Sequence, residues 1–284
     1  MQIGTLTIVG VGLIGGSIGL AARRRGLASR IRGVGWKQTT LDEALARGAI
    51  DEGTLDLKAG VAGADVVVFC TPVAGLVEQV LTASTYVSAG TLLTDAGSTK
   101  AVFVRGVEGR LPAGVDFVGS HPLAGSEKRG PAHADGQLFE GRLTIVTRTP
   151  QTAAAALERT TAFWQALGSR VRVMSPEDHD AALAVTSHLP HLVAATLAGI
   201  LPSTLVDLTA TGFRDTTRVA AGDPNLWCGI FQQNREALLT ALTRFRERLQ
   251  QFQEALEGDQ ADVLMELLEE AHRIRTGLPS NTGH

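Results

Sequence analysis

Short apolar runs alternate with helical patterns through the first half of the chain. The runs that predict strands cover residues 6–9, 30–35, 65–70, 91–95, 116–119, 143–147 and 170–173. Helical patterns lie between most of them, notably at residues 17–25, 41–47 and 151–167. This alternation predicts an α/β domain of the Rossmann type, with a doubly wound, mostly parallel sheet and ligands beyond the carboxyl ends of its strands.

Helical patterns replace this alternation after the last predicted strand and continue to the end of the chain. Ser175 is a strong helix N-cap, with Pro176 at the first helical position and acidic residues in the first turn. We therefore expect a dinucleotide-binding domain at residues 1–174, followed by an all-α domain for substrate binding and dimerisation at residues 175–284.

A second long helix is expected from Pro224 to about Leu256, with a final helix after a break at Gly258 and Asp259. Apolar residues spaced alternately four and three apart occur at Leu238, Leu242, Phe245, Leu249, Phe252 and Leu256. Such spacing is typical of helix–helix packing. It is compatible with a hairpin core within one chain and with a homodimer interface, and we expect a homodimer through these C-terminal helices.

Composition and charge exclude several classes of protein. The chain has 284 residues and a formal net charge of −3, with dispersed basic residues, so no surface for nucleic acid is indicated. No signal-peptide pattern opens the chain and no apolar run is long enough to span a bilayer, which predicts a cytoplasmic protein without membrane contact. Cys70 and Cys228 lie far apart without ligand spacing, so neither a disulfide framework nor a metal site is expected.

A glycine-rich turn follows the first predicted strand and precedes the first predicted helix. Gly10, Gly12 and Gly15 form a GxGxxG pattern, with Leu13 and Ile14 between the last two glycines. Glycines permit a tight turn and close approach of the backbone to a pyrophosphate, whose charge the helix N-terminus stabilises. In this strand-to-helix context we expect all five residues to bind a dinucleotide.

The end of the second predicted strand bears on the choice of cofactor. An acidic residue roughly twenty positions beyond the fingerprint glycines normally binds the ribose hydroxyls in NAD enzymes. Here Gly35 takes that place, so no carboxylate repels a ribose phosphate, and Lys37 and Thr39 are candidates to bind one. Trp36 is a candidate to pack against the adenine. We expect NADP to be favoured and NAD to be possible, the alternative being that Lys37 is merely solvated on a loop.

Polar residues follow three further predicted strands, and a pair of histidines lies in the helical part. Thr71 and Pro72, which are candidate cofactor contacts, follow the predicted strand at residues 65–70. Ser98 follows the strand at residues 91–95, and His121 follows the strand at residues 116–119. Parallel strands end at one edge, so these residues should share a crevice. His188 and His191 lie three residues apart, on one face of a helix that Pro190 should kink. A kink beside paired histidines favours a functional role over a purely structural one.

Taken together, the motifs are specific and span nearly the whole chain. They are the GxGxxG turn extended by Gly16-Ser17, Asp95-x-Gly-Ser-x-Lys, His121-Pro-x-Ala-Gly-Ser-Glu127, Ser187-His-Leu-Pro-His191, and Gly212-Phe-x-Asp-x-Thr-Arg218 followed by Trp227. The chain resembles the prephenate and arogenate dehydrogenases of tyrosine biosynthesis, without the chorismate mutase or ACT domains that some relatives carry. It departs from them at Gly35, where many members have an aspartate.

The resemblance implies an oxidative decarboxylation of a cyclohexadienol. Hydride passes from the hydroxyl-bearing carbon to NAD(P), and loss of carbon dioxide makes the ring aromatic, giving 4-hydroxyphenylpyruvate or tyrosine. His121 would accept a hydrogen bond from the ring hydroxyl, and Ser98 would orient that hydroxyl. The implied substrate contacts are Arg218, which offers a fork for a carboxylate, together with His191, His188, Glu127, Gly212 and Trp227.

Several alternatives stay open at this point. Another two-domain NAD(P) oxidoreductase, such as a β-hydroxyacid dehydrogenase or a pyrroline carboxylate reductase, would share the fold, and so would a non-enzymatic NADPH-sensing module. Arg218 could instead form a structural salt bridge with Asp215. Glu127 and the complete Ser-His-Leu-Pro-His segment favour prephenate over arogenate, but both substrates carry the groups that His121 and Arg218 would contact.

Overall fold

The computed structural model describes residues 2–125, 128 and 130–278. Two compact units make up the chain, Met1–Arg235 and Glu236–His284. The domain boundary that the sequence predicts after residue 174 lies inside the larger unit, because the helices that follow Ser175 up to Arg235 belong to that unit. That boundary stays a prediction.

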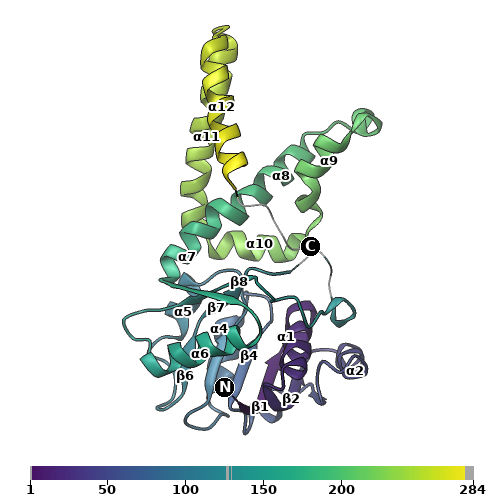
Figure 1. The fold of residues 1–284 in the computed structure, drawn as a ribbon, viewed down its shortest axis with the longest axis vertical. Helices are drawn as coiled ribbons and strands as arrows, with labels where there is room; N and C mark the ends of the chain where they lie inside the picture. Colours follow the sequence, from purple (N-terminus) through teal and green to yellow (C-terminus); the bar gives the residue numbers. More distant parts are fainter. Residues whose placement is uncertain (1, 126–127, 129, 279–284) are drawn as a thin grey trace. The chain divides into compact units, whose positions relative to one another are not determined.

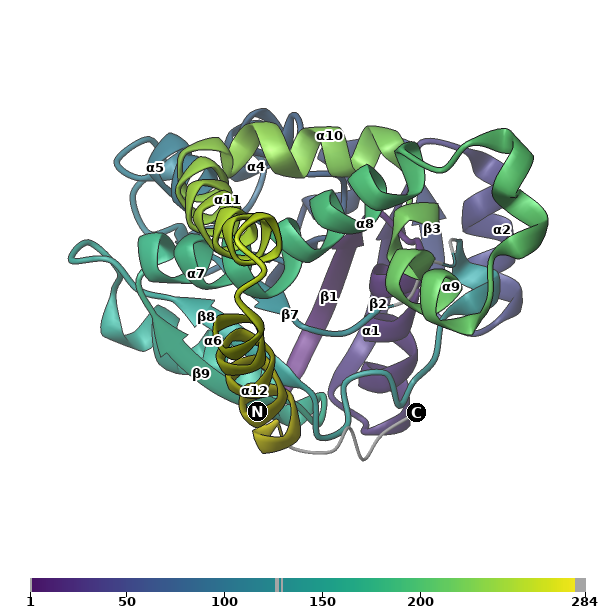
Figure 2. The ribbon, with the colours of Figure 1, turned by 90° about the horizontal axis from the view of Figure 1, so that it is seen from above.

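A six-stranded parallel sheet forms the centre of the larger unit (Figure 1). Its strands, in the order β3-β2-β1-β4-β5-β6, are β1 (Ile3–Val9), β2 (Ala28–Val34), β3 (Glu52–Thr54), β4 (Val66–Phe69), β5 (Leu92–Asp95) and β6 (Asp116–Val118). Figure 2 shows β1 in the middle of this unit, as the strand order requires. The predicted Rossmann-type sheet is thereby confirmed.

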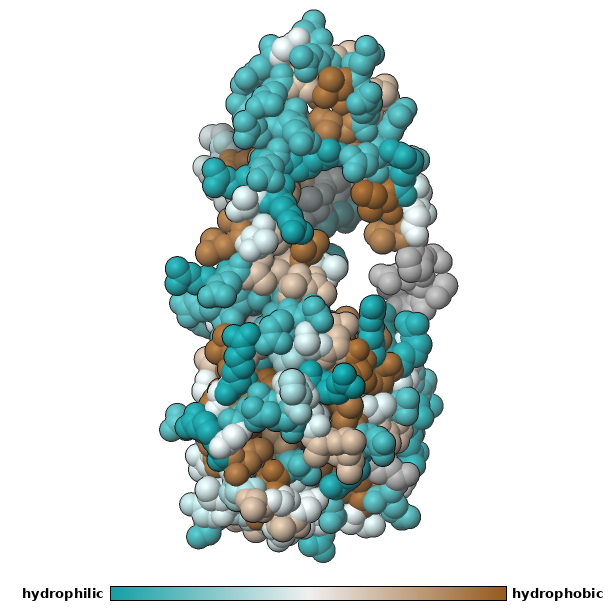
Figure 3. Space-filling model, turned by 90° about the vertical axis from the view of Figure 1, so that its left-hand side faces the viewer, coloured by the Kyte–Doolittle hydropathy of each residue, from teal (hydrophilic) through white to brown (hydrophobic). Residues whose placement is uncertain are grey.

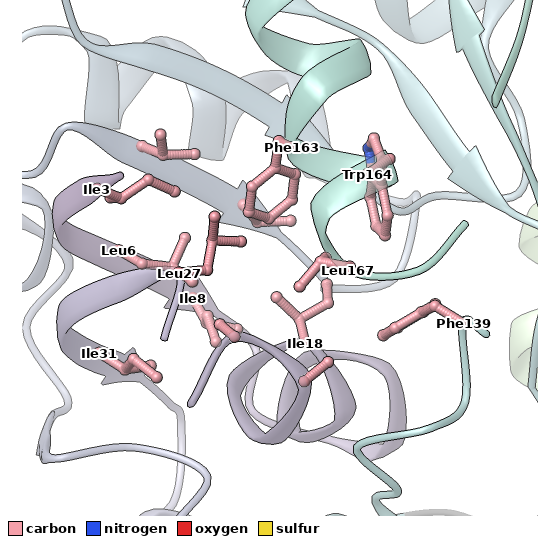
Figure 4. Close-up of a cluster of buried hydrophobic side chains, with 14 of the residues drawn as sticks. Ile3, Leu6, Ile8, Ile18, Leu27, Ile31, Phe139, Phe163, Trp164 and Leu167 are labelled. Atoms are coloured by element: carbon pink, nitrogen blue, oxygen red, sulfur yellow. The ribbon is translucent and has the colours of Figure 1, made fainter. Parts of the chain in front are cut away.

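Helices cover both faces of this sheet. Residues of α1 (Leu13–Arg24), α2 (Gln38–Ala46) and α6 (Ala154–Ala166) join one buried cluster with Leu6 and Ile8 (Figure 4). Residues of α3 (Leu57–Val61), α4 (Leu76–Ser84) and α5 (Ala101–Val107) join a second cluster with Val9 and Phe69. Successive side chains of a strand point to opposite faces, so strands covered on both sides must be apolar throughout. This is why the central strands are continuous apolar runs.

A second, three-stranded sheet corrects the prediction of a single sheet. It contains β7 (Ser120–Pro122), antiparallel to β8 (Leu143–Thr147), and β9 (Arg170–Met174), parallel to β8. A short 3₁₀ helix, η1 (Pro131–His133), lies between β7 and β8. Gly119 alone separates β6 from β7, and a Cβ atom there would lie 2.6 Å from Thr147 Oγ1. His121 therefore lies within β7, opposite Ile145, and not in a loop after a strand.

Helices follow β9 to the end of the larger unit. They are α7 (Pro176–Leu183), the π-helical turn η2 (Ala184–His188), α8 (Leu189–Gly199), η3 (Ser203–Leu208), α9 (Thr211–Thr217), η4 (Arg218–Ala221) and α10 (Pro224–Gln233). The Ser175 hydroxyl accepts a hydrogen bond from Asp178 N at 3.0 Å, as its predicted N-cap role requires. Pro190 has no N–H, and the wide turn η2 directly precedes α8, in whose first turn Pro190 lies. The predicted kink at Pro190 stays a prediction.

The predicted long helix from Pro224 to Leu256 is interrupted at Asn234. Helix α10 ends at Gln233 and α11 (Arg235–Glu257) begins after Asn234, whose φ is −104° and ψ 32°. Asn234 departs from helical geometry while its side-chain amide donates to the carbonyl oxygen of Asp180 at 2.8 Å. In the smaller unit, α12 (Ala261–Gly277) follows α11 after the predicted break, and Arg248 of α11 pairs with Glu270 of α12.

One continuous helical segment also corrects the expectation about membrane spans. Residues Pro176–Gly199 are long and apolar enough, by length and composition alone, to cross a bilayer. The same segment carries Asp180, His188 and His191, all of them buried in the folded chain. Ionisable side chains are costly in lipid, so we interpret the segment as a helix of the folded protein.

Candidate active site

The glycine-rich turn fits a dinucleotide on steric grounds. Gly10 has a φ of +94°, and a Cβ atom there would lie 2.9 Å from the backbone of Cys70. A Cβ atom at Gly15 would lie 2.2 Å from the Gly10 carbonyl oxygen, so only glycine allows α1 to start this close to β1. At Gly12 a Cβ atom would meet no described atom within 4 Å, which leaves room for a pyrophosphate at the N-terminus of α1.

The other candidate cofactor residues lie around this turn. Leu13 and Ile14 are half-buried in the first turn of α1. Thr71 is buried against Gly10, and its hydroxyl donates to Gln79 Oε1 at 2.7 Å, whereas Pro72 is exposed.

The end of β2 also lies beside the turn. The Gly10 N–H donates to the carbonyl oxygen of Val34 at 2.8 Å, which brings Gly35 to the same edge of the sheet. After Gly35 the side chains of Trp36, Lys37 and Thr39 are exposed. Among the described residues, none of the three has a partner for a side-chain hydrogen bond or ion pair, so all three are open to a ligand.

A hydrogen-bonded row of three side chains contains the predicted catalytic histidine. His121 Nδ1 lies 2.9 Å from His179 Nε2, and His179 Nδ1 lies 2.7 Å from Asp180 Oδ1. Asp180 also accepts backbone N–H groups of Lys100 and Ala101, each at 2.8 Å, at the start of α5. The row therefore joins β7 to α7 and α5.

The Asp95-x-Gly-Ser-x-Lys segment forms a buried ion pair beside this row. Lys100 Nζ lies 2.6 Å from Asp95 Oδ2, and neither side chain is exposed. The other Asp95 oxygen accepts the Ser120 N–H at 2.9 Å, which fixes the start of β7 one residue before His121. Ser98 lies half-buried in the loop between the two charged residues.

His188 and His191 are both buried but make different contacts. The side-chain nitrogen Nδ2 of Asn234 lies 2.9 Å from His188 Nδ1 and thus joins His188 to Asp180. His191 stacks on Trp227, with ring centroids 3.6 Å apart and planes 13° apart. His191 Nδ1 is buried and has no hydrogen-bond partner among the described residues.

Burial keeps these histidines neutral. It is the main cause that lowers the pKa of His121 well below its usual value, and the positive charge of Lys100 acts in the same direction. Burial likewise lowers the pKa of His179, against the opposing effect of Asp180, and lowers the pKa of His188 to about 4. A neutral imidazole at His121 is able to accept a proton near neutral pH.

The remaining predicted substrate residues lie on or near α9 and η4. Gly212 and Arg218 are exposed, and Arg218 forms no ion pair with any described residue, including Asp215. Helix α8 packs against both α9 and η4, and a Cβ atom at Gly222 would lie 3.1 Å from His191 Cε1. This places the end of η4 beside the His191–Trp227 stack. Glu127 lies outside the described residues.

Four residues of the site were not predicted from the sequence, namely His179, Asp180, Asn234 and Gly222. His179 and Asp180 follow an N-cap and two acidic residues, so they resembled the solvated first turn of a helix. Their helix also carries His188 and His191, and that shared element was the one signal that pointed to them. Asn234 was hidden inside an apparently continuous helix.

The chain combines a glycine turn on a parallel sheet with a half-buried, neutral histidine at the same end of that sheet. Together they define a dinucleotide-dependent oxidoreductase with a helical second part. Residues 18–173 match the nucleotide-binding domain of prephenate dehydrogenase, and residues 175–270 match its dimerization domain. The chain belongs to the prephenate dehydrogenase family. It is therefore an NAD(P)-dependent oxidoreductase of the prephenate and arogenate dehydrogenase type, and the alternatives outside this family are set aside.

Individual relatives align with this chain over most or nearly all of their own length. A cyclohexadienyl dehydrogenase of Zymomonas mobilis is 32% identical, over 97% of this chain and 96% of that protein. A prephenate dehydrogenase of Bacillus subtilis is 34% identical, over 97% of this chain and 76% of that protein. The crystal structure of prephenate dehydrogenase from A. aeolicus, in complex with hydroxyphenyl propionate and NAD+, superimposes with a TM-score of 0.90, at 33% identity over 97% of this chain and 98% of that one.

Proposed function

We propose that the chain oxidises and decarboxylates prephenate in preference to arogenate, in the cytoplasm, with His121 as the proton acceptor. The observation that carries this proposal is the state of His121: a neutral, half-buried imidazole whose Nδ1 is already bonded to His179. Its Nε2 atom is the one left for a substrate. The bound dinucleotide would supply the hydride acceptor, held by the glycine turn between β1 and α1.

Proton transfer, orientation of the substrate and binding of its carboxylate are assigned to residues of the chain. His121 Nε2 takes the proton of the ring hydroxyl as the hydroxyl-bearing carbon becomes a carbonyl. Ser98 orients the same hydroxyl. Aromatisation drives the loss of carbon dioxide, so the protein has mainly to hold the substrate in place. Arg218 binds a substrate carboxylate with its planar fork.

The side chain of the substrate is assigned to the His191–Trp227 stack. The Nδ1 atom of His191 is buried and lacks a described partner, and a polar atom buried without a partner is costly unless a ligand supplies one. We assign the ring proton of His191 to Nδ1, which would then donate to an oxygen atom of a pyruvyl group, whereas the ammonium of an alanyl group would find no acceptor there; this assignment supports prephenate. Glu127, Gly212 and His188 stay predicted contacts of this region.

Steady-state assays with prephenate and arogenate, each with NAD and with NADP, test the proposal directly. We expect a higher kcat/KM for prephenate than for arogenate. A higher kcat/KM for arogenate would contradict the assignment of the pyruvyl group to His191, and turnover of neither substrate would contradict the proposed function.

We also propose that the chain favours NADP over NAD, because Gly35 stands where a carboxylate would bind the ribose hydroxyls, and this preference predicts the effect of a substitution at the end of β2. Gly35→Asp should weaken NADP binding and favour NAD, because a carboxylate there repels the ribose phosphate and accepts hydrogen bonds from the ribose hydroxyls. A Cβ atom at Gly35 would lie 3.0 Å from the Leu41 side chain, so Leu41 must shift slightly. Gly35→Ala is the matched control, since it adds the same Cβ atom without a charge. The ratio of kcat/KM for the two dinucleotides is the measurement, and strong preference of the native protein for NAD would overturn the proposal.

Exposed apolar side chains on the smaller unit support a homodimer. In Figure 3, brown apolar patches lie between polar side chains at the end that α11 and α12 form. The exposed apolar residues of these helices include Leu239, Leu249, Leu256, Val263, Met265, Leu268 and Ile274. Exposed apolar side chains gathered on two paired helices are typical of an interface. We infer a homodimer through the C-terminal helices.

Sedimentation equilibrium at micromolar concentration should therefore find a dimer. Leu249→Arg should shift the protein toward monomer, because Leu249 is 57% exposed in a single chain and would be covered in the dimer. Gln250→Arg, at the neighbouring exposed position, is the control. A native protein that is a stable, active monomer at that concentration would rule the dimer out.

A further inference from the structure

Asp180, at one end of the hydrogen-bonded row, determines which nitrogen atoms donate and which accept as far as His121 at the other end. Asp180 Oδ1 is within hydrogen-bonding distance of His179 Nδ1 and accepts the Lys100 N–H, while Oδ2 accepts the Ala101 N–H. Burial opposes ionisation of Asp180, but the hydrogen bonds from His179 and Ala101 prevail and lower its pKa. An ionised carboxylate only accepts hydrogen bonds. His179 must therefore carry its proton on Nδ1.

The position of the proton on His179 in turn determines the tautomer of His121. A neutral imidazole has one N–H donor and one bare nitrogen. With its proton on Nδ1, His179 presents a bare Nε2 to His121 Nδ1, 2.9 Å away. His121 must then carry its proton on Nδ1, which leaves its Nε2 bare. The opposite arrangement would place the Nε2–H of His121 toward the substrate hydroxyl. Its bare Nδ1 would then face the bare Nε2 of His179 or, with the His179 proton moved to Nε2, the bare Nδ1 of His179 would face the Asp180 carboxylate.

Both rings are neutral, as this argument requires. His179 has no exposed surface, and burial lowers the pKa of each histidine. The row is also anchored at its far end, because the carbonyl oxygen of Asp180 accepts the Asn234 amide at 2.8 Å. The ring planes of His121 and His179 are 63° apart, so the bond between them also limits rotation of His121.

We propose that His179 and Asp180 are positioning residues that hold His121 in the tautomer with a bare Nε2 toward the reacting hydroxyl. This inference rests on the proposed role of His121 as proton acceptor. The proton of the hydroxyl then forms a bond to Nε2 while the hydroxyl O–H bond breaks, and the electron pair of the carbon–hydrogen bond leaves with the hydride to the dinucleotide. The Nδ1–H bond of His121 to His179 is kept throughout and stabilises the imidazolium.

Nitrogen NMR of protein with ¹⁵N-labelled histidine measures the tautomer without any substrate. The signals of His121 are assigned by their loss in His121→Asn. In the native protein near pH 7, we expect a protonated Nδ1 and an unprotonated Nε2 on His121. A proton on Nε2 would overturn the inference, even if the native protein turned over prephenate normally.

Two substitutions test the row by kinetics. His179→Phe keeps a ring of similar size but removes both nitrogens, and Asp180→Asn replaces an obligate acceptor by a group that also donates. Each should change the tautomer signal of His121 and lower kcat by about 10²–10⁴-fold, with little change in the KM for the dinucleotide. Asp178→Asn, at an exposed position on the same helix, is the control and should change neither.

The outcomes separate this inference from the proposed function. A folded His179→Phe protein with native kcat and a native His121 signal would overturn the positioning role. By contrast, a native protein with the expected tautomer but no turnover of prephenate or arogenate would overturn the proposed function and leave the hydrogen-bonded row as a structural feature. Since the native spectrum alone decides the tautomer, variants that fail to fold do not prevent the test.

Discussion

His121→Asn is expected to lower kcat by about 10²–10⁴-fold, the usual range for loss of an acid–base group, while substrate still binds. Asparagine keeps a polar side chain at this position of β7, opposite Ile145 of β8, but has no nitrogen that takes up a proton. Steady-state kinetics with prephenate, together with the dissociation constant of the dinucleotide, measure the effect. Near-native turnover would remove His121 from the mechanism.

The pH dependence of the native enzyme supplies a second check on His121. A proton acceptor must be unprotonated in the free enzyme, so kcat/KM falls as the pH falls through its pKa. Because burial lowers the pKa of His121 well below 6.5, the acidic limb should lie well below pH 6.5. This limb should be absent from the residual activity of His121→Asn. A limb at or above the ordinary histidine pKa would contradict the neutral, buried state of His121.

Arg218→Gln is expected to weaken substrate binding much more than dinucleotide binding. The loss should be roughly 2–5 kcal/mol if bound substrate leaves its carboxylate buried and unpaired. Arg218 is exposed and forms no ion pair with the described residues, so the melting temperature should change little. Dissociation constants for prephenate and for the dinucleotide, with a thermal melt of each protein, measure these effects.

The matched control for this substitution is Arg214→Gln. Arg214 is an exposed arginine on α9, four residues before Arg218, and its removal changes the net charge equally. Equal losses of substrate binding in both variants would indicate a general electrostatic effect and not a specific fork. An Arg218→Gln protein that melts early but binds substrate normally would establish a structural role for Arg218.

The main sheet could be predicted because its strands leave a strong pattern. The central strands are buried on both faces, so they are apolar throughout, and Gly10 and Gly15 mark a turn where the backbone needs glycine. Strands β3 (Glu52–Thr54) and β7 (Ser120–Pro122) have three residues each and, unlike β6, contain no two adjacent apolar residues that would mark a strand. The second sheet was missed for this reason, since β7 is the strand that pairs with β8.

The candidate site was predictable only as far as its chemistry is local in the sequence. His121, His188 and His191 stand in motifs whose residue types and spacing already indicate function. His179 gains its importance from a contact with His121, which is 58 residues away, and Asn234 from a contact with His188, 46 residues away. No periodicity predicts such pairings, because tertiary packing creates them.

The π-helical turn η2 determines which side of its helix each histidine occupies. An α-helix turns about 100° per residue, so the nine positions from His179 to His188 would place them on opposite sides of an unbroken α-helix. The wider turn reduces this angle, and Asn234 contacts both His188 and the backbone of Asp180. Val185 and Thr186 are exposed within this turn, so we expect substitutions of their side chains to be tolerated. A change in the number of residues in the turn should not be tolerated. Deletion of either one would rotate α8 by about a quarter-turn and carry His188 and His191 away from the row that begins at Asp180.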